Sequence, residues 1–122
     1  MKALFDSNII IDYLNGLPQA QIEIDRFKTK AVSIITYIEV GVGIRDVLIM
    51  HKIENFLTTH FDIIPVNQTI ANLAIQSRQK YKLKVPDAII FSTAQFINGL
   101  LVTRDDKDFP VSDPMVRIPY QI

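Results

Sequence analysis

Short apolar runs, each followed by a segment with helical spacing, constrain the fold of this chain more than any other feature. The first run, residues 3–5, is too short for a helix and is bounded by turn-forming residues, so it is predicted to be a buried strand. The other predicted strands cover residues 31–34, 62–66 and 100–103, with a possible last strand at 116–118. Strands that alternate with helices indicate a parallel sheet covered on both faces. The pattern therefore predicts an α/β fold, a three-layer α/β/α sandwich around a mostly parallel sheet of four to five strands.

The predicted helices fill the segments between these strands. The first has Ser7 or Asn8 as its N-cap and ends at Asn15-Gly16, a left-handed cap. Residues 35–50 are predicted to be helical although β-branched residues are dense there, because the apolar positions follow helical spacing. The remaining helices are expected over residues 18–27 and 51–60, after Asn67 up to the basic segment 78–84, and over residues 87–98.

Length and composition limit the classes of protein that the chain can represent. Its 122 residues are enough for one domain with a real core, so a single domain over residues 1–122 is expected. Hydrophobic residues make up 48% and charged residues 21%, an ordinary globular balance. The sequence contains no Cys, which excludes a disulfide framework and a thiolate zinc site.

The distribution of apolar and charged residues bears on location and partners. No apolar run is long enough to span a bilayer, and the first residues lack the long apolar region of a signal peptide. A cytoplasmic protein with no membrane partner is therefore expected. The formal net charge is zero, with 13 basic and 13 acidic residues, so any binding of nucleic acid requires a local basic patch.

Four acids are predicted to meet at one edge of the sheet. Asp6 and Asp105 each follow an apolar strand, and carboxyl ends of neighbouring parallel strands lie at the same edge. Glu39 lies about one helical turn beyond the end of the second strand, and Asp87 begins the most apolar helix. Carboxylates held close together repel one another and need a cation or a shared proton. Hard cations such as Mg²⁺ or Mn²⁺ meet that need with oxygen ligands and retained waters.

Each acid also has an ordinary structural explanation. Asp6 can cap a helix, Asp87 can favour a helix N-terminus by its charge, Asp105 can be a turn residue, and Glu39 can point to solvent. Taken singly, each of these explanations is preferred. The metal-site hypothesis gains weight because all four acids fall on one predicted edge, and because Glu39 stands between two apolar residues.

Four segments of the chain, in order, resemble the signature segments of the PIN domain, and in particular those of VapC-type toxins. They are residues 4–8, 35–43, 85–90 and 101–109. The resemblance covers the chain almost end to end. It implies a PIN-like parallel sheet between helices and a ribonuclease that depends on Mg²⁺ or Mn²⁺. It further implies a homodimer, a cognate antitoxin that blocks the site, and Asp6, Glu39 and Asp87 as metal-site acids.

The fourth acid of the resemblance has two candidates. Many VapC-like chains have Asn at the position of Asp105 and an acid at the position of Asp108, whereas this chain has an acid at both. Asp105 is preferred because it is nearer to the end of the strand. Ser7, Asn8 and Thr103 are expected to be polar neighbours that support the acids.

Basic residues near two of the acids are candidates for contact with an RNA backbone. Lys82 and Lys84, in a segment that also includes Arg78 and Lys80, precede Asp87, and Arg104 precedes Asp105. A solvated helix end, where cations suit the helix dipole, explains the lysines equally well.

The sequence as a whole favours a metal-dependent endoribonuclease that cleaves RNA phosphodiesters, with catalytic acids Asp6, Glu39, Asp87 and Asp105 and with Asp108 as a further metal ligand. The expected role is that of the toxin of a VapBC-type pair. Two alternatives remain: a non-catalytic PIN-like interaction module, and a receiver-like phospho-acceptor domain. The receiver alternative expects an Asp at the end of the third strand, where this chain has Pro65-Val66-Asn67.

Overall fold

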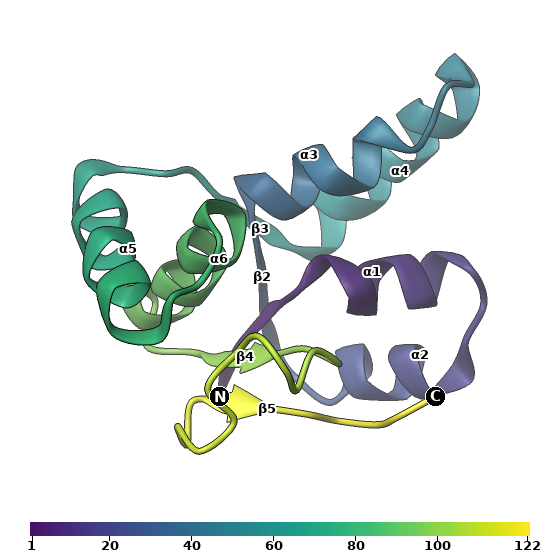
Figure 1. Ribbon diagram of the computed structural model, residues 1–122. Helices are drawn as coiled ribbons and strands as arrows, with labels where there is room; N and C mark the ends of the chain where they lie inside the picture. Colours follow the sequence, from purple (N-terminus) through teal and green to yellow (C-terminus); the bar gives the residue numbers. More distant parts are fainter.

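Five strands and six helices alternate along residues 1–122, which the computed structural model describes in full (Figure 1). In chain order they are β1 (Lys2–Phe5), α1 (Ser7–Leu14), α2 (Pro18–Asp25), β2 (Thr29–Ser33), α3 (Ile34–Val42), α4 (Val47–His60), β3 (Asp62–Ile64), α5 (Gln68–Tyr81), α6 (Val85–Phe96), β4 (Leu100–Val102) and β5 (Val116–Arg117).

All four neighbouring strand pairs are parallel, and the strand order across the sheet is β3-β2-β1-β4-β5. The central strand is β1, in which Leu4 is in register with Ala31 of β2 and Leu101 of β4. Every strand of this sheet is short because each apolar run ends at a polar or turn-forming residue. The predicted parallel sheet of four to five strands is confirmed.

Helices cover both faces of the sheet, as Figure 1 shows. Successive side chains of a strand point to opposite faces. Ala3 and Phe5 accordingly pack into a core with α1, α2, α3 and α4, while Leu4 packs into a second core with α5 and α6. Both cores are made of fully or almost fully buried apolar side chains. The predicted three-layer α/β/α sandwich is therefore confirmed.

The predicted helix over residues 35–50 is wrong, because the chain breaks there into two helices. α3 ends at Val42, with Gly43, a residue that disfavours helix, as its C-cap. α4 begins after Asp46 and continues to His60, so residues 51–60 belong to it and do not form a separate helix. The Asp46 carboxylate accepts hydrogen bonds from the N–H groups of Leu48 and Ile49 at 2.9 and 3.1 Å, which caps the new helix. Together α3 and α4 form a hairpin that projects beyond the sheet (Figure 1).

Smaller differences from the predicted boundaries have local causes. β3 ends at Ile64 rather than residue 66, since Pro65 has no N–H to continue the ladder. The N-cap of α1 is Asp6, not Ser7 or Asn8. The predicted turn at Asn15-Gly16 is confirmed, with Gly16 at a φ of 84°. α5 ends at Tyr81, and Lys82 caps it in the left-handed conformation at a φ of 58°.

None of the six helices has both the length and the apolar character that crossing a membrane requires.

Candidate active site

The point where the strand order reverses lies between β1 and β4. In open parallel sheets, ligands bind outside the carboxyl ends of the strands at such a point. Asp6 follows β1 directly, and the segment from Thr103 to Asp108 follows β4. The backbone N–H of Asp6 donates to the carbonyl of Val102 at 2.9 Å, so the two strand ends are joined at the start of the site.

Asp6 is the most enclosed of the predicted site acids, with 6% of its surface exposed. Its Oδ1 accepts the backbone N–H of Ser7 at 2.7 Å. Its Oδ2 accepts the hydroxyl of Thr103 at 2.7 Å and a longer hydrogen bond, 3.3 Å, from Nδ2 of Asn8. The three polar neighbours predicted from the sequence thus all contact this carboxylate, and they fix its orientation.

The electrostatic surroundings of Asp6 favour its protonated form. Burial raises the pKa of Asp6 to about 6; the hydrogen bonds from Thr103 and Ser7 lower it, and the charges of Asp87 and Glu39 raise it further. The charges of two other acids, Asp87 and Glu39, thus act on the carboxylate of Asp6. A bound cation would offset the repulsion between these carboxylates.

Glu39 reaches this edge from α3, where its side chain is exposed. The hydroxyl of Ser7 donates to Oε1 of Glu39 at 2.5 Å and lies 3.2 Å from the hydroxyl oxygen of Thr36. Ser7 therefore links Asp6, through its N–H, with Glu39, through its hydroxyl.

Asp87, Asp105 and Asp108 form the tightest acidic group. One carboxylate oxygen from each lies within 4.8 Å of the others. Burial raises the pKa of Asp87 above its usual value; the charges of Asp105, Asp108 and Glu39 raise it too, while Lys84 lowers it. The structure thus places both candidates for the fourth acid beside Asp87.

The loop that carries two of these acids is folded around its own polar groups. The hydroxyl oxygen of Thr103 accepts the N–H of Asp105 at 3.0 Å. Oδ1 of Asp105 in turn accepts the N–H groups of Lys107 and Asp108 at 3.1 and 3.0 Å. Asp105 therefore closes the turn that brings Asp108 back toward the site, and one of its oxygens is used inside the loop.

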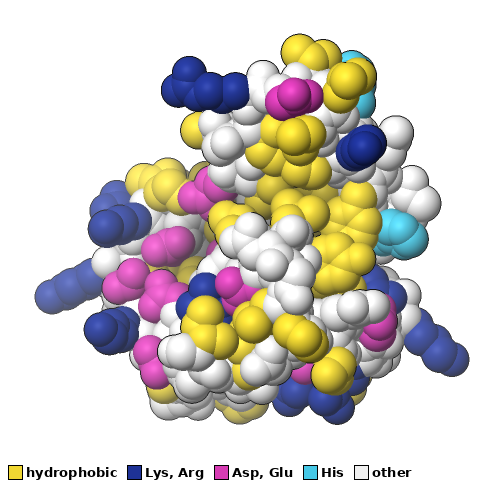
Figure 2. Space-filling view, turned by 90° about the vertical axis from the view of Figure 1, so that its right-hand side faces the viewer, with side chains coloured by type: hydrophobic (Ala, Val, Ile, Leu, Met, Phe, Trp, Pro, Cys, Tyr) yellow, Lys and Arg dark blue, Asp and Glu magenta, His cyan; other side chains and the backbone are white.

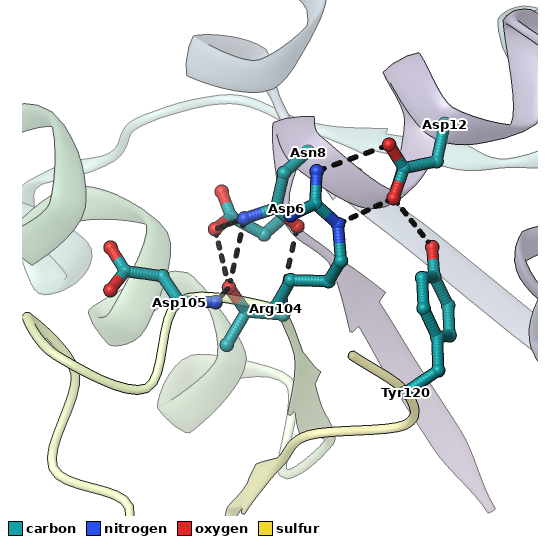
Figure 3. A network of polar contacts seen from close by, with 7 residues as sticks. Asp6, Asn8, Asp12, Arg104, Asp105 and Tyr120 are labelled. Carbon is teal, nitrogen blue, oxygen red and sulfur yellow. Dashed lines mark hydrogen bonds and ion pairs between the residues drawn. The ribbon is translucent and has the colours of Figure 1, made fainter. Parts of the chain in front are cut away.

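Arg104 is held by a partner that the sequence did not suggest. Its guanidinium donates to both oxygens of Asp12, with Nε to Oδ2 at 2.6 Å and Nη2 to Oδ1 at 3.1 Å, and the hydroxyl of Tyr120 donates to Oδ2 at 2.8 Å (Figure 3). Asp12 is buried on α1 beside Ile9 and Ile10. A carboxylate on an apolar helix face requires a partner, which is the signal that could have drawn attention to it.

Lys82 and Lys84, the lysines predicted to contact RNA, are both exposed. Lys82 and Lys84 both stand free of ion pairs, and Lys84 is close enough to Asp87 to lower its pKa. Arg78 instead stabilises the end of α5, because its Nε donates to the carbonyl of Leu83 at 2.7 Å.

The donor set fits a hard divalent cation. Every acid at the site offers only carboxylate oxygens, which Mg²⁺ and Mn²⁺ prefer. Carboxylate oxygens of Asp87, Asp105 and Asp108 lie within 4.8 Å of one another, so these three acids are near enough to approach one cation.

Comparisons with known proteins agree with this architecture. The solved "Toxin-antitoxin complex from Klebsiella pneumoniae" contains a chain that is 42% identical, with a TM-score of 0.92 over 99% of this chain and 100% of that one. FitAcB from Neisseria gonorrhoeae (22% identity, TM-score 0.80, 98% and 99% covered) and VapBC2 from Rickettsia felis (20%, 0.79, 95% and 96%) share the fold. No match was found among curated protein sequences. The family model described as PIN domain matches residues 3–111, and the chain therefore belongs to the PIN domain family.

Proposed function

We propose that this protein is a metal-dependent endoribonuclease, the toxin of a VapBC-type toxin–antitoxin pair. The observation that carries the proposal is the convergence of five acids from four separate segments at the sheet edge where β1 and β4 end. Electrostatic coupling among them supports it, since Asp6 and Asp87 each have a pKa raised partly by the other acids. The five are Asp6, Glu39, Asp87, Asp105 and Asp108.

The positions of the acids give them different roles in the proposed reaction. Asp87, Asp105 and Asp108 would hold Mg²⁺ or Mn²⁺. Asp6, which Thr103 and Asn8 keep oriented, would be a further ligand from outside that group. When bound, the cation supplies a Lewis acid that activates water and offsets charge at a phosphodiester.

Glu39 has an exposed carboxylate, one oxygen of which is hydrogen-bonded to Ser7. It can therefore accept a proton at the solvent side of the site and act as a general base.

The substrate approaches from the side of the exposed lysines. Lys82 and Lys84 are proposed to contact the RNA backbone, because the chain has no net charge and a local patch must supply the attraction. Arg104 contributes less to RNA binding than its position in the sequence suggested, since Asp12 engages its guanidinium through two hydrogen bonds.

A groove between α1 and the α3–α4 hairpin is the proposed place of the antitoxin. It has a volume of about 360 Å³, and its apolar lining ends at Glu39. Figure 2 shows the band of apolar side chains on this face and the acidic side chains beside it. An antitoxin segment in the groove would reach an acid of the site and so block it. The apolar lining consists of Ile11, Leu14, Val40, Ile44 and Ile53.

A homodimer is also proposed, as the resemblance implies. The exposed apolar side chains at the tip of the α3–α4 hairpin support a protein contact there, because such side chains rarely gather on a monomer's surface without a partner. They are Val42, Val47, Leu48 and Ile49. The molecular mass in solution, alone and with the antitoxin, tests both associations.

The alternatives differ in what they require. A receiver-like domain has the strand order 2-1-3-4-5, whereas here β1 lies between β2 and β4, which speaks against that alternative. A non-catalytic PIN-like module would neither require metal nor cleave RNA, so a cleavage assay distinguishes it from the proposed function.

The test is cleavage of an RNA transcript by the purified protein after metal removal, with and without added Mn²⁺. The wild type is expected to cleave only with metal, and Asp6→Asn to lose cleavage while keeping its fold. Asp106→Asn is the matched control, since Asp106 lies in the same loop but outside the acidic group. Cleavage by folded Asp6→Asn at the wild-type rate would contradict the assignment.

A further inference from the structure

A second polar network lies beside the acids and is not part of them. It consists of Asp12 on α1, Arg104 in the loop after β4, and Tyr120 near the C-terminus (Figure 3). Asp12 has 7% of its surface exposed and accepts all three hydrogen bonds of the network. Residues distant in the sequence therefore meet at one buried carboxylate.

This network holds the acid-bearing loop through a single residue. Arg104 stands between Thr103, which binds Asp6, and Asp105. The backbone N–H of Arg104 donates to Oδ1 of Asn8 at 3.2 Å, and its guanidinium donates to Asp12. Asn8 and Asp12 are four residues apart on α1 and so lie on the same face of that helix. One helix face thus fixes both the backbone and the side chain of Arg104.

We propose that Asp12 is a positioning residue of the metal site and acts through Arg104. It holds the loop of residues 103–108 against α1, so that Asp105 and Asp108 face Asp87. Tyr120 orients Asp12 for this task by its hydrogen bond. The inference rests on the proposed function, because it concerns the same acids and the same cation.

Asp12 also favours metal binding in a second way. Arg104 is a cation next to a group of carboxylates, and a guanidinium that lacks a partner pairs readily with any carboxylate in reach. The fork-like pair with Asp12 engages Nε and one terminal nitrogen, and so keeps the cation from competing for the acids that hold the metal. Loss of Asp12 therefore both loosens the loop and releases a competing charge.

The chain provides a matched control in a second buried ion pair. Glu23 on α2 has 3% of its surface exposed and accepts hydrogen bonds from Arg117 at 2.5 and 3.0 Å and from Arg26 at 3.1 Å. This pair also ties the C-terminal part of the chain to a helix, yet it contains no residue of the acidic loop. A purely structural role of Asp12 predicts that its loss resembles the loss of Glu23.

The experiment compares Mn²⁺ affinity, measured by titration calorimetry of metal-free protein, for the wild type, Asp12→Asn and Glu23→Gln, with folding checked by circular dichroism. Both variants are expected to melt at lower temperature than the wild type. Only Asp12→Asn is expected to bind Mn²⁺ about 10-fold or more weakly, the usual size of effect for a residue that orients metal ligands. Its kcat for RNA cleavage should fall with KM within about twofold.

A double variant tests whether Asp12 acts through Arg104. The protein with both substitutions, Asp12→Asn and Arg104→Gln, should bind Mn²⁺ no more weakly than the weaker-binding single variant. The reason is that each substitution removes the same interaction. Arg104→Lys keeps the charge but loses the two-point geometry, so it carries the same test if Asp12→Asn does not fold. Tyr120→Phe should show a smaller loss in the same direction.

Four results would overturn the inference. Mn²⁺ affinity of folded Asp12→Asn equal to that of the wild type, or equal losses in Asp12→Asn and Glu23→Gln, would overturn it alone and leave the proposed function intact. A raised KM for RNA in Arg104→Gln with unchanged Mn²⁺ affinity would assign Arg104 to RNA binding instead. If the wild type binds no Mn²⁺ at all, the proposed function fails and the inference fails with it.

Discussion

The hydroxyl of Thr103 donates a 2.7 Å hydrogen bond to the carboxylate of Asp6, across 97 positions of the sequence. The two residues follow β4 and β1, the strands between which the order of the sheet reverses. Thr103 is fully buried, so the bond is shielded from water. It joins the two halves of the site, because the same hydroxyl oxygen also accepts the N–H of Asp105.

Replacing Thr103 by Val should therefore weaken both the fold and the site. The variant keeps the shape of the side chain but leaves Asp6 without its shortest side-chain hydrogen bond, which is expected to cost about 1–3 kcal/mol of unfolding free energy. The pKa of Asp6 should rise further, since the Thr103 bond lowers it. Urea denaturation and Mn²⁺ titration at about pH 7 check both effects.

Thr93→Val is the control for that experiment. Thr93 is equally buried, but its hydroxyl donates to the carbonyl of Ile89 within α6 and to none of the acids. This variant should change Mn²⁺ affinity little. Equal loss of affinity in both variants would mean that Thr103 has no special link to the site.

The raised pKa of Asp6 predicts a pH dependence of the metal-free protein. Because the folded-state pKa, about 6, lies above the unfolded value of 3.8, the folded protein binds more protons between these limits. The contribution of Asp6 to stability is thus fully present below pH 3.8 and is lost as the pH rises through about 6. The loss is on the order of 3 kcal/mol. Asp6→Asn in EDTA should show a smaller decrease of the melting temperature over this range than the wild type.

The raised pKa of Asp6 also opposes metal binding at low pH. Mn²⁺ must displace the proton from Asp6, so affinity should fall as the pH drops below about 6. Calorimetry in buffers of different ionisation enthalpy would detect the released proton. Binding that is independent of pH between about 5 and 7 would show that Asp6 stays ionised without metal.

Metal should stabilise the fold by linkage. Mn²⁺ or Mg²⁺ binds the folded acids and not the unfolded chain, so it should raise the melting temperature of the metal-stripped wild type. The increase should shrink in Asp87→Asn, which loses a member of the tightest acidic group, and persist in Asp106→Asn. Identical melting curves with and without metal would argue against a shared site.

Asp105 and Asp108 can be ranked by substitution with Ala. Both lie in the group with Asp87, but Asp105 also accepts the N–H groups of Lys107 and Asp108 and so holds the turn. Asp105→Ala should therefore weaken Mn²⁺ affinity and RNA cleavage more than Asp108→Ala does. An inactive Asp108→Ala beside a nearly unaffected Asp105→Ala would reverse the ranking.

The sequence was most informative where one residue's place follows from local pattern. Asp6 and Asp105 were placed correctly at one edge because each ends an apolar run, and parallel strands carry such ends to the same side. The break between α3 and α4 was missed, because the apolar spacing continues through Gly43 while the cap at Asp46 is a single side-chain interaction.

The sequence was least informative about pairs that only the tertiary fold creates. Arg104 and Asp12 are 92 positions apart, and Tyr120 and Asp12 are 108 apart. No periodicity connects them, so the sequence predicts only an RNA contact for Arg104. Their pairing depends on how β4 and the C-terminal segment pack against α1.

The most direct test of a metal-dependent active site at these acids compares metal occupancy with cleavage in one preparation. Metal-free protein is titrated with Mn²⁺, and bound Mn²⁺ and the rate of RNA cleavage are measured at each concentration. The two curves should rise together, EDTA should abolish both, and Asp87→Asn should shift both to higher Mn²⁺ while Asp106→Asn shifts neither. Cleavage in metal-free protein, or a fully occupied site that leaves every tested RNA intact, would contradict the account.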